Sequence, residues 1–229
     1  MWPNIDYGNS SYFLYFAFLV GVTAGLYFFL KKRSERFRWV ALFLIVLSAF
    51  LLHFLKIWMI TDYRNNLPYS YSYMTMDNIC AVNAILFPFI FLSKSKLLKD
   101  YMVILGILSG LMAFIIPIDG FNNQPFDPKV IRFYYSHYVI FAVPFLMGAL
   151  KVHRIDIRRI LVLPLIVFGV MGLVLVNEIF LNLVGIIDTT FTNYYSGEFR
   201  NQAFVFGIPE VLSGFKAIVY PMTPKIFLT

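Results

Sequence analysis

The chain is poor in cysteine, histidine and charged residues. Its 229 residues include one cysteine, Cys80, and three histidines, and 14% of the residues are charged. Because a single cysteine cannot form an intramolecular disulfide, cysteine usage gives no information on the redox state of the compartment. The sequence also lacks a glycine-rich phosphate-binding loop, which argues against a nucleotide-binding protein. We therefore expect no cofactor.

Two further absences concern metals and targeting. The cysteine, the histidines and the carboxylates stand on separate parts of the chain without metal-ligand spacing, so we expect no metal site. The first 11 residues contain Asp6 but no lysine or arginine. Because a secretory signal peptide begins with a basic region and ends at a small-residue cleavage site, we expect the first apolar stretch to be retained.

Apolar residues, by contrast, are in large excess. They make up 60% of the chain, and the mean hydropathy is +0.74, both outside the range of soluble globular domains. Most of six apolar stretches reach the roughly 20 residues that a helix needs to cross a bilayer. We predict an all-α fold, a polytopic integral membrane helix bundle, in one transmembrane domain over 1–229. The predicted spans are residues 12–30, 39–60, 76–93, 101–118, 133–150 and 160–182.

The C-terminal tail has a less regular apolar run, which Lys216, Pro221 and Pro224 interrupt. Two interpretations remain open, namely a seventh span over 209–228 or a helix that lies in the membrane interface.

Lysine and arginine are concentrated in alternate connections between the predicted spans. The positive-inside rule places such connections in the cytoplasm, which puts the N-terminus outside in a multi-pass protein of the cell membrane. The net charge of +7 then reflects mainly topology, with some attraction to anionic lipid headgroups, and we expect no nucleic-acid partner. The residues that carry this pattern are Lys31, Lys32, Arg33, Arg36 and Arg38, then Lys94, Lys96 and Lys99, then Lys151, Arg154, Arg158 and Arg159.

In this orientation nearly every polar residue within the spans falls at one depth, in the outer half of the membrane. His53 and Lys56 share a helix face because they are three residues apart, as do Asp77 and Cys80. Ionisable side chains inside a bilayer cost a few kcal/mol unless they are paired or hydrated, so they usually face the interior of a bundle. We therefore predict a polar cavity that opens outward between the second, third, fifth and sixth spans. Its candidate residues are His53, Lys56, Asp77, Asn78, Cys80, Asn83, Asp119, Arg132, His137, Asn177 and Glu178.

Several of these residues also have a plainer interpretation. The Lys56 ammonium can extend to the membrane interface, or it can form a structural ion pair with Glu178. Asn83 and Asn177 can serve as interhelical hydrogen-bonding groups. A lone buried cysteine such as Cys80 commonly acts as a small hydrophobic residue.

Three short elements resemble those of a known family. Residues 78–84 read NICAVNA, residues 116–119 read IPID, and residues 131–137 read IRFYYSH. This pattern resembles the YwaF-like integral membrane family of bacteria, which is similar to a vertebrate membrane acyltransferase that remodels phospholipids with a cysteine and a histidine. The resemblance implies that Cys80 is the nucleophile and His137 is the base. Where the bacterial pattern commonly has a histidine two residues before the cysteine, this chain has Asn78.

Two functions therefore remain in view. The first is a thiol-dependent phospholipid acyltransferase or acyl hydrolase that works through acyl-Cys80. In it, Lys56 or Arg132 would hold the lipid phosphate, and Asn78 or Asn83 would donate to the oxyanion. The second is a non-enzymatic membrane protein that binds or transports a small ligand or a lipid. The charge partners of that ligand would be His53, Lys56, Asp77 and Glu178.

Overall fold

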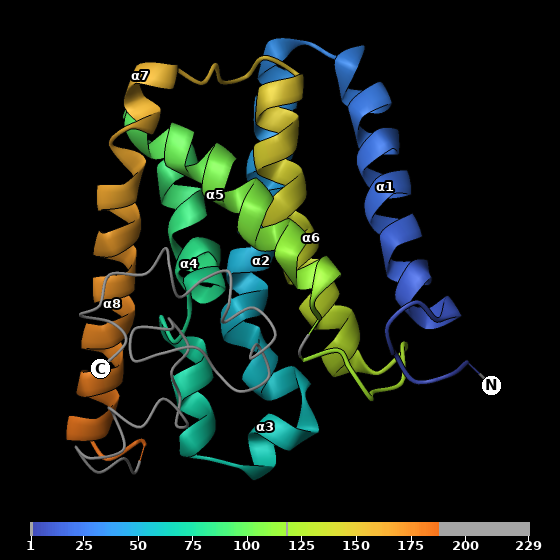
Figure 1. Ribbon diagram of the computed structural model, residues 1–229, viewed down its shortest axis with the longest axis vertical. Coiled ribbons are helices and arrows are strands. Elements are labelled where there is room, and N and C mark those ends of the chain that lie inside the picture. The colour runs from blue at the N-terminus through green and yellow to red at the C-terminus, as the bar shows by residue number, and fades with distance from the viewer. Residues whose placement is uncertain (1, 118, 188–229) are drawn as a thin grey trace, which may run out of the picture.

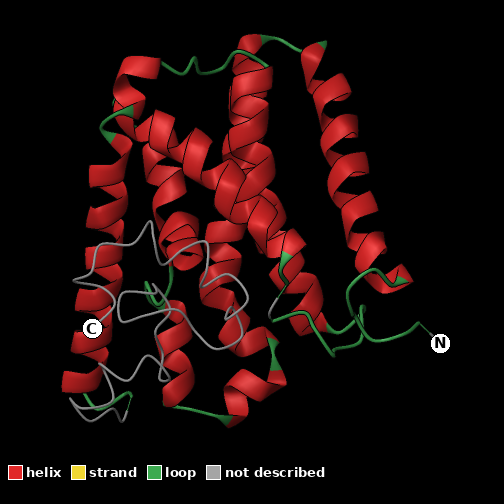
Figure 2. Ribbon diagram, viewed as in Figure 1, coloured by secondary structure: helices red, strands yellow, loops and turns green. Residues whose placement is uncertain are grey.

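The computed structural model describes residues 2–117 and 119–187, and this part of the chain is helical, without strands (Figures 1 and 2). Five of its helices are long and apolar enough to cross a membrane, which confirms the predicted polytopic helical bundle. They are α1 (Ser10–Lys31), α2 (Glu35–Met59), α5 (Lys96–Ile115), α6 (Pro128–Ala149) and α8 (Leu163–Leu183). The shorter elements are α3 (Thr61–Asn65), the 3-10 helix η1 (Tyr69–Met74), α4 (Ile79–Leu92) and α7 (Ile157–Ile160).

Capping residues, and not the edges of the apolar runs, decide where most of these helices begin. Ser34 accepts a hydrogen bond from the Phe37 amide and starts α2, and Ser95 does the same for Leu98 at the start of α5. Asp127 caps α6, where Pro128 at the first turn suits the fixed proline φ. These helices therefore begin four or five residues before the spans predicted from hydropathy.

The third predicted span, 76–93, differs most from expectation. Asn78 caps α4, so the helix begins at Ile79 and has 14 residues. The fourth predicted span, 101–118, corresponds to α5, which ends earlier, at Ile115. The tail over 209–228, for which a seventh span or an interfacial helix was predicted, lies outside the described residues.

The helices alternate in direction, which brings the basic connections to one end of the bundle. The connections α1–α2, α4–α5 and α6–α7 lie at the top of Figure 1, and we call this the basic end. The N-terminal segment, α3 and the α5–α6 connection lie at the opposite end, which we call the N-terminal end.

Helices α5 and α6 cross at close range through two glycines. A Cβ atom on Gly106 would lie 2.6 Å from Pro144 Cγ, and one on Gly110 would lie 2.6 Å from the Phe141 backbone nitrogen. Small residues four apart permit this approach between membrane helices. By contrast, a Cβ atom on Gly21 or Gly25 of α1 would meet nothing within 4 Å in the described part of the chain.

The N-terminal segment is attached to the α5–α6 connection. The Ile5 amide donates to the Asn123 carbonyl at 3.0 Å, and the Asn122 amide donates to the Ile5 carbonyl at 3.0 Å. The Tyr7 ring packs on the Phe121 ring at 4.5 Å between centroids. These contacts hold the connection that carries Asp119 against the start of α1.

Candidate functional site

Cys80 lies in the first turn of α4, directly after the cap. The Asn78 Oδ1 accepts a hydrogen bond from the Ala81 amide at 2.8 Å, and its Nδ2 donates to the Asp77 Oδ1 at 3.1 Å. The partial positive charge at the N-terminus of a helix favours a thiolate at this position, whereas the negative charges of Asp77 and Asp119 act against it. Cys80 itself is partly buried. The role that the structure gives Asn78 is that of a cap, and the oxyanion contact stays a prediction.

His137 lies on α6 with one ring nitrogen fixed. Its Nδ1 donates to the Phe133 carbonyl one turn earlier, at 2.8 Å. A carbonyl oxygen can only accept, so this contact sets the tautomer of the neutral ring and leaves Nε2 with its lone pair. The Phe133 ring also packs on the imidazole, with 4.4 Å between centroids. His137 can therefore accept a proton at Nε2.

His53 and Lys56 lie together on α2 and face inward. The Lys56 Nζ donates to the His53 Nδ1 at 3.5 Å, and the His53 Nε2 donates to the Met74 carbonyl at 3.1 Å. Lys56 is 6% exposed and His53 is 5% exposed. The Lys56 ammonium is thus inside the bundle, and the pair connects α2 to η1.

Charged groups from three other segments act on these residues. Arg132, Asp77 and Asp119 act electrostatically on Lys56. Asp119 acts on both Cys80 and His137, which come from different helices. We call the residues joined in this way the polar cluster: His53, Lys56, Asp77, Cys80, Asp119, Arg132 and His137. The structure therefore brings most of the sequence-predicted residues together, although no hydrogen bond joins Cys80 to His137 among the described residues.

Arg132 offers an unused donor to the polar cluster. Its Nε atom is buried and has no hydrogen-bond partner in the described part of the chain. Buried polar groups are nearly always satisfied in folded proteins, so an orphaned guanidinium donor is consistent with an anion that binds there.

Tyr63 on α3 is a residue that the sequence did not single out as part of the site. Burial raises its pKa above the usual range, and the charges of Arg132, Asp119 and Asp77 act on it. Its ring lies 5.1 Å from that of Tyr73. In the sequence it looks like an interfacial aromatic residue, because its charged neighbours are close only in space.

Asn83 makes the interhelical contacts that its plainer interpretation predicts, whereas Asn177 joins α8 to the segment between η1 and α4. The Tyr101 hydroxyl donates to the Asn83 Oδ1 at 2.6 Å, and the Asn83 Nδ2 donates to the Ser109 Oγ at 3.1 Å, so Asn83 joins α4 to α5. The Asn177 Nδ2 donates to the Thr75 Oγ1 at 2.9 Å. Glu178 follows on α8 and is buried.

No group of three or more histidine, cysteine, aspartate or glutamate side chains that could hold a metal ion is found within residues 2–117 and 119–187. The site thus consists of a thiol, two imidazoles, two cationic groups and two carboxylates, drawn from α2, α4, α6 and the segments that precede α4 and α6.

Comparison with family models assigns the chain to a family. Searches of curated proteins and of solved structures give no match. The family model described as the TMEM164 family matches residues 7–206, which is most of the chain and includes the whole polar cluster. The protein is an integral membrane protein that belongs to the TMEM164 family.

Proposed function

We propose that the protein is a thiol-dependent phospholipid acyltransferase or acyl hydrolase, and that the polar cluster lines a cavity in which Cys80 carries the acyl group. The observation that carries this proposal is a cysteine in the first turn of α4 together with a histidine on α6 whose Nδ1 donates to a carbonyl and whose Nε2 keeps its lone pair. The resemblance to the YwaF-like family, and through it to a cysteine- and histidine-dependent acyltransferase, supports the same assignment.

In the first step the Cys80 sulfur attacks the carbonyl carbon of a phospholipid ester. The His137 Nε2 takes the thiol proton as the S–C bond forms. When the ester C–O bond breaks, His137 returns the proton to the leaving lysophospholipid oxygen, and an acyl thioester remains on Cys80. The negative charge on the tetrahedral intermediate is stabilised by the Ile79 and Cys80 backbone amides in the first turn of α4, which lack intrahelical acceptors, whereas the Ala81 amide donates to the Asn78 cap.

In the second step a lysophospholipid hydroxyl or water attacks the thioester. His137 removes the proton of the attacking group and delivers it to the sulfur as the S–C bond breaks. The first acceptor gives acyl transfer and the second gives hydrolysis, with no net oxidation or reduction. A catalytic hydrogen bond often tightens only when substrate is bound. The lack of a hydrogen bond between Cys80 and His137 among the described residues is therefore compatible with this scheme.

Arg132 and Lys56 are proposed to bind the lipid phosphate. Arg132 has an unpartnered buried Nε donor, and Lys56 is a buried ammonium within the same cluster. A guanidinium and an ammonium match the charge of a phosphodiester.

The intact mass of the purified protein after incubation with a defined phospholipid tests this proposal. We expect an acyl-sized adduct that hydroxylamine removes, and no adduct in Cys80→Ser or His137→Ala. Ser48→Ala is the matched control, because it removes a hydrogen bond between α2 and Tyr135 of α6 outside the polar cluster. An adduct in either site variant, or a wild type that forms neither adduct nor lysophospholipid, would contradict the mechanism.

A second candidate is a non-enzymatic protein that binds or transports a small ligand or a lipid. The buried charges of Lys56, Asp77 and Glu178 favour it, because such groups inside a bilayer commonly mark ligand or ion pathways. In that case Cys80→Ala leaves ligand binding unchanged, whereas Lys56→Ala or Glu178→Ala weakens it.

For location we propose the cell membrane, with the basic end in the cytoplasm and the N-terminal end outside. The positive-inside rule supports this orientation.

A further inference from the structure

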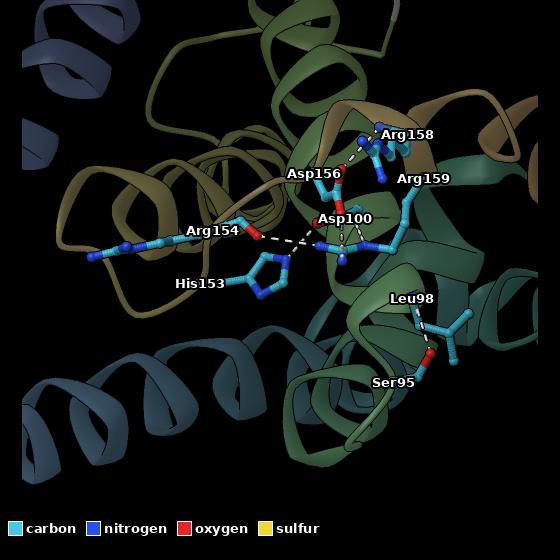
Figure 3. Close-up of polar contacts among 8 residues, drawn as sticks. All are labelled: Ser95, Leu98, Asp100, His153, Arg154, Asp156, Arg158 and Arg159. Carbon is cyan, nitrogen blue, oxygen red and sulfur yellow. Dashed lines mark hydrogen bonds and ion pairs between the residues drawn. The ribbon is translucent and has the colours of Figure 1, made fainter.

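A second set of buried charges lies at the basic end, away from the polar cluster. Asp100, in the second turn of α5, is 0% exposed. Its Oδ1 accepts a hydrogen bond from the His153 Nε2 at 2.6 Å, and its Oδ2 accepts one from the Arg159 Nε at 2.5 Å. Figure 3 shows both side chains directed at the carboxylate. Asp100 therefore fixes the α6–α7 connection onto the start of α5.

These contacts neutralise some basic residues and leave others free. The Arg159 Nη1 also donates to the Asp156 Oδ2 at 3.2 Å, and hydrogen bonding to Asp100 raises the pKa of the Arg159 guanidinium. The other oxygen of Asp156, Oδ1, accepts a hydrogen bond from the Arg158 backbone amide. In the described part of the chain, the exposed side chains of Lys151, Arg154 and Arg158 form no ion pair. The Arg154 side chain points away from Asp100 in Figure 3.

Exposed aliphatic side chains alternate with these free cations. Ile157 is 79% exposed, Leu161 is 83% exposed, and Ile155 is exposed as well. The segment lies where two membrane helices end, and it exposes both cations and aliphatic groups. This combination is typical of an element at the membrane surface. Its aliphatic groups enter the acyl region, and its cations stay at the level of the headgroups.

We propose that residues 151–162 form a binding surface for anionic phospholipid headgroups, with Arg154 and Arg158 as the main phosphate contacts. The arginine guanidinium suits a phosphodiester because it donates in a fixed fork. Asp100 is a positioning residue, since its carboxylate forms an ion pair with the Arg159 guanidinium and holds the segment in place. The surface lies at the opposite end of the bundle from Cys80, so the proposal does not depend on acyl transfer.

The test compares the wild type with Arg154→Gln/Arg158→Gln in nanodiscs of phosphatidylcholine, with and without phosphatidylglycerol. Native mass spectrometry measures retained phosphatidylglycerol, and thermal unfolding in pure phosphatidylcholine checks folding. Each cation at the membrane surface contributes a few-fold to affinity, so we expect retention to fall on the order of tenfold in the double variant. Arg154→Lys/Arg158→Lys keeps the charges and should lose much less.

Lys32→Gln/Arg36→Gln is the matched control, because it removes two exposed charges at the same end, one from the α1–α2 connection and one from the first turn of α2. We expect it to retain phosphatidylglycerol. Equal loss of phosphatidylglycerol in both double variants would mean that the basic end attracts anionic lipid in general, which overturns a site at residues 151–162. Unchanged retention in Arg154→Gln/Arg158→Gln would also overturn it. If inorganic phosphate stabilises the wild type in phosphatidylcholine as much as phosphatidylglycerol does, the site binds a free anion and the proposal is overturned.

Discussion

At the scale of single residues, Asp100 and Asn78 show how one polar side chain fixes a segment. Asp100 receives hydrogen bonds from side chains 53 and 59 residues later in the chain. Asn78 satisfies an amide of α4 and places Cys80 in the first turn. In both cases a short polar group decides where a longer element lies.

The contribution of Asp100 to stability follows from its two charge-assisted hydrogen bonds. Asp100→Asn keeps the shape but removes the negative charge, and its amide group faces donors from His153 and Arg159. We expect the free energy of unfolding in detergent to fall by about 1–2 kcal/mol, since the Arg159 side chain is partly exposed and solvent screens part of its interaction with the buried carboxylate.

Asp156→Asn is the control for this prediction. Asparagine also caps helices, so we expect a change within about 0.5 kcal/mol. Equal losses in the two variants would indicate that Asp100 has no special role in holding the α6–α7 connection.

At the scale of elements, the crossing of α5 and α6 depends on the absence of side chains at two positions. Gly106→Ala and Gly110→Ala would place a Cβ atom within 3 Å of backbone atoms of α6. The helices must then separate, and we expect a loss of about 1–3 kcal/mol, measured by thermal unfolding in one detergent.

Glycines of the same spacing on α1 provide the comparison. Gly21→Ala and Gly25→Ala meet nothing within 4 Å among the described residues. Because alanine favours a helix over glycine, we expect no loss, or a gain of up to about 1 kcal/mol. If Gly21→Ala or Gly25→Ala lowers stability as much as Gly106→Ala does, the close α5–α6 crossing is not the reason for the loss at Gly106.

The sequence was sufficient for the fold class and for the approximate place of the long helices, because hydropathy reports burial in lipid directly. It could not give the short elements. The α3, η1 and α7 helices have few residues, and their positions depend on contacts such as His53 with Met74 and Arg159 with Asp100. Tyr63 was missed for the same reason. The polar cluster was predicted from the positions of its members near the ends of their spans, but their individual partners could not be.

At the scale of the whole molecule, the bundle has two charged regions at opposite ends. The polar cluster lies where α2 ends and where α4 and α6 begin, at the N-terminal end, and the Asp100 contacts join the start of α5 to the α6–α7 connection at the basic end. This separation allows the orientation in the membrane to be tested without disturbing either region.

Single cysteines in a Cys80→Ser background provide that test. We expect a cysteine at Gln124, in the α5–α6 connection, to react with a membrane-impermeant thiol reagent in intact cells, and one at Lys94 to react only after permeabilisation. The positive-inside rule is the reason. The reverse pattern of labelling would mean that the basic end faces outward.

The short α4 has a consequence for the lipid itself. Fourteen residues span about 21 Å at 1.5 Å per residue, whereas the hydrocarbon core is about 30 Å thick. If the last turn of α4 lies at one edge of that core, its first turn lies roughly 9 Å inside the other edge, below the usual level of a phospholipid ester. Under the proposed acyl transfer, local thinning of the membrane would bring the ester to Cys80, and the acyl chain length of the surrounding bilayer would then set the rate.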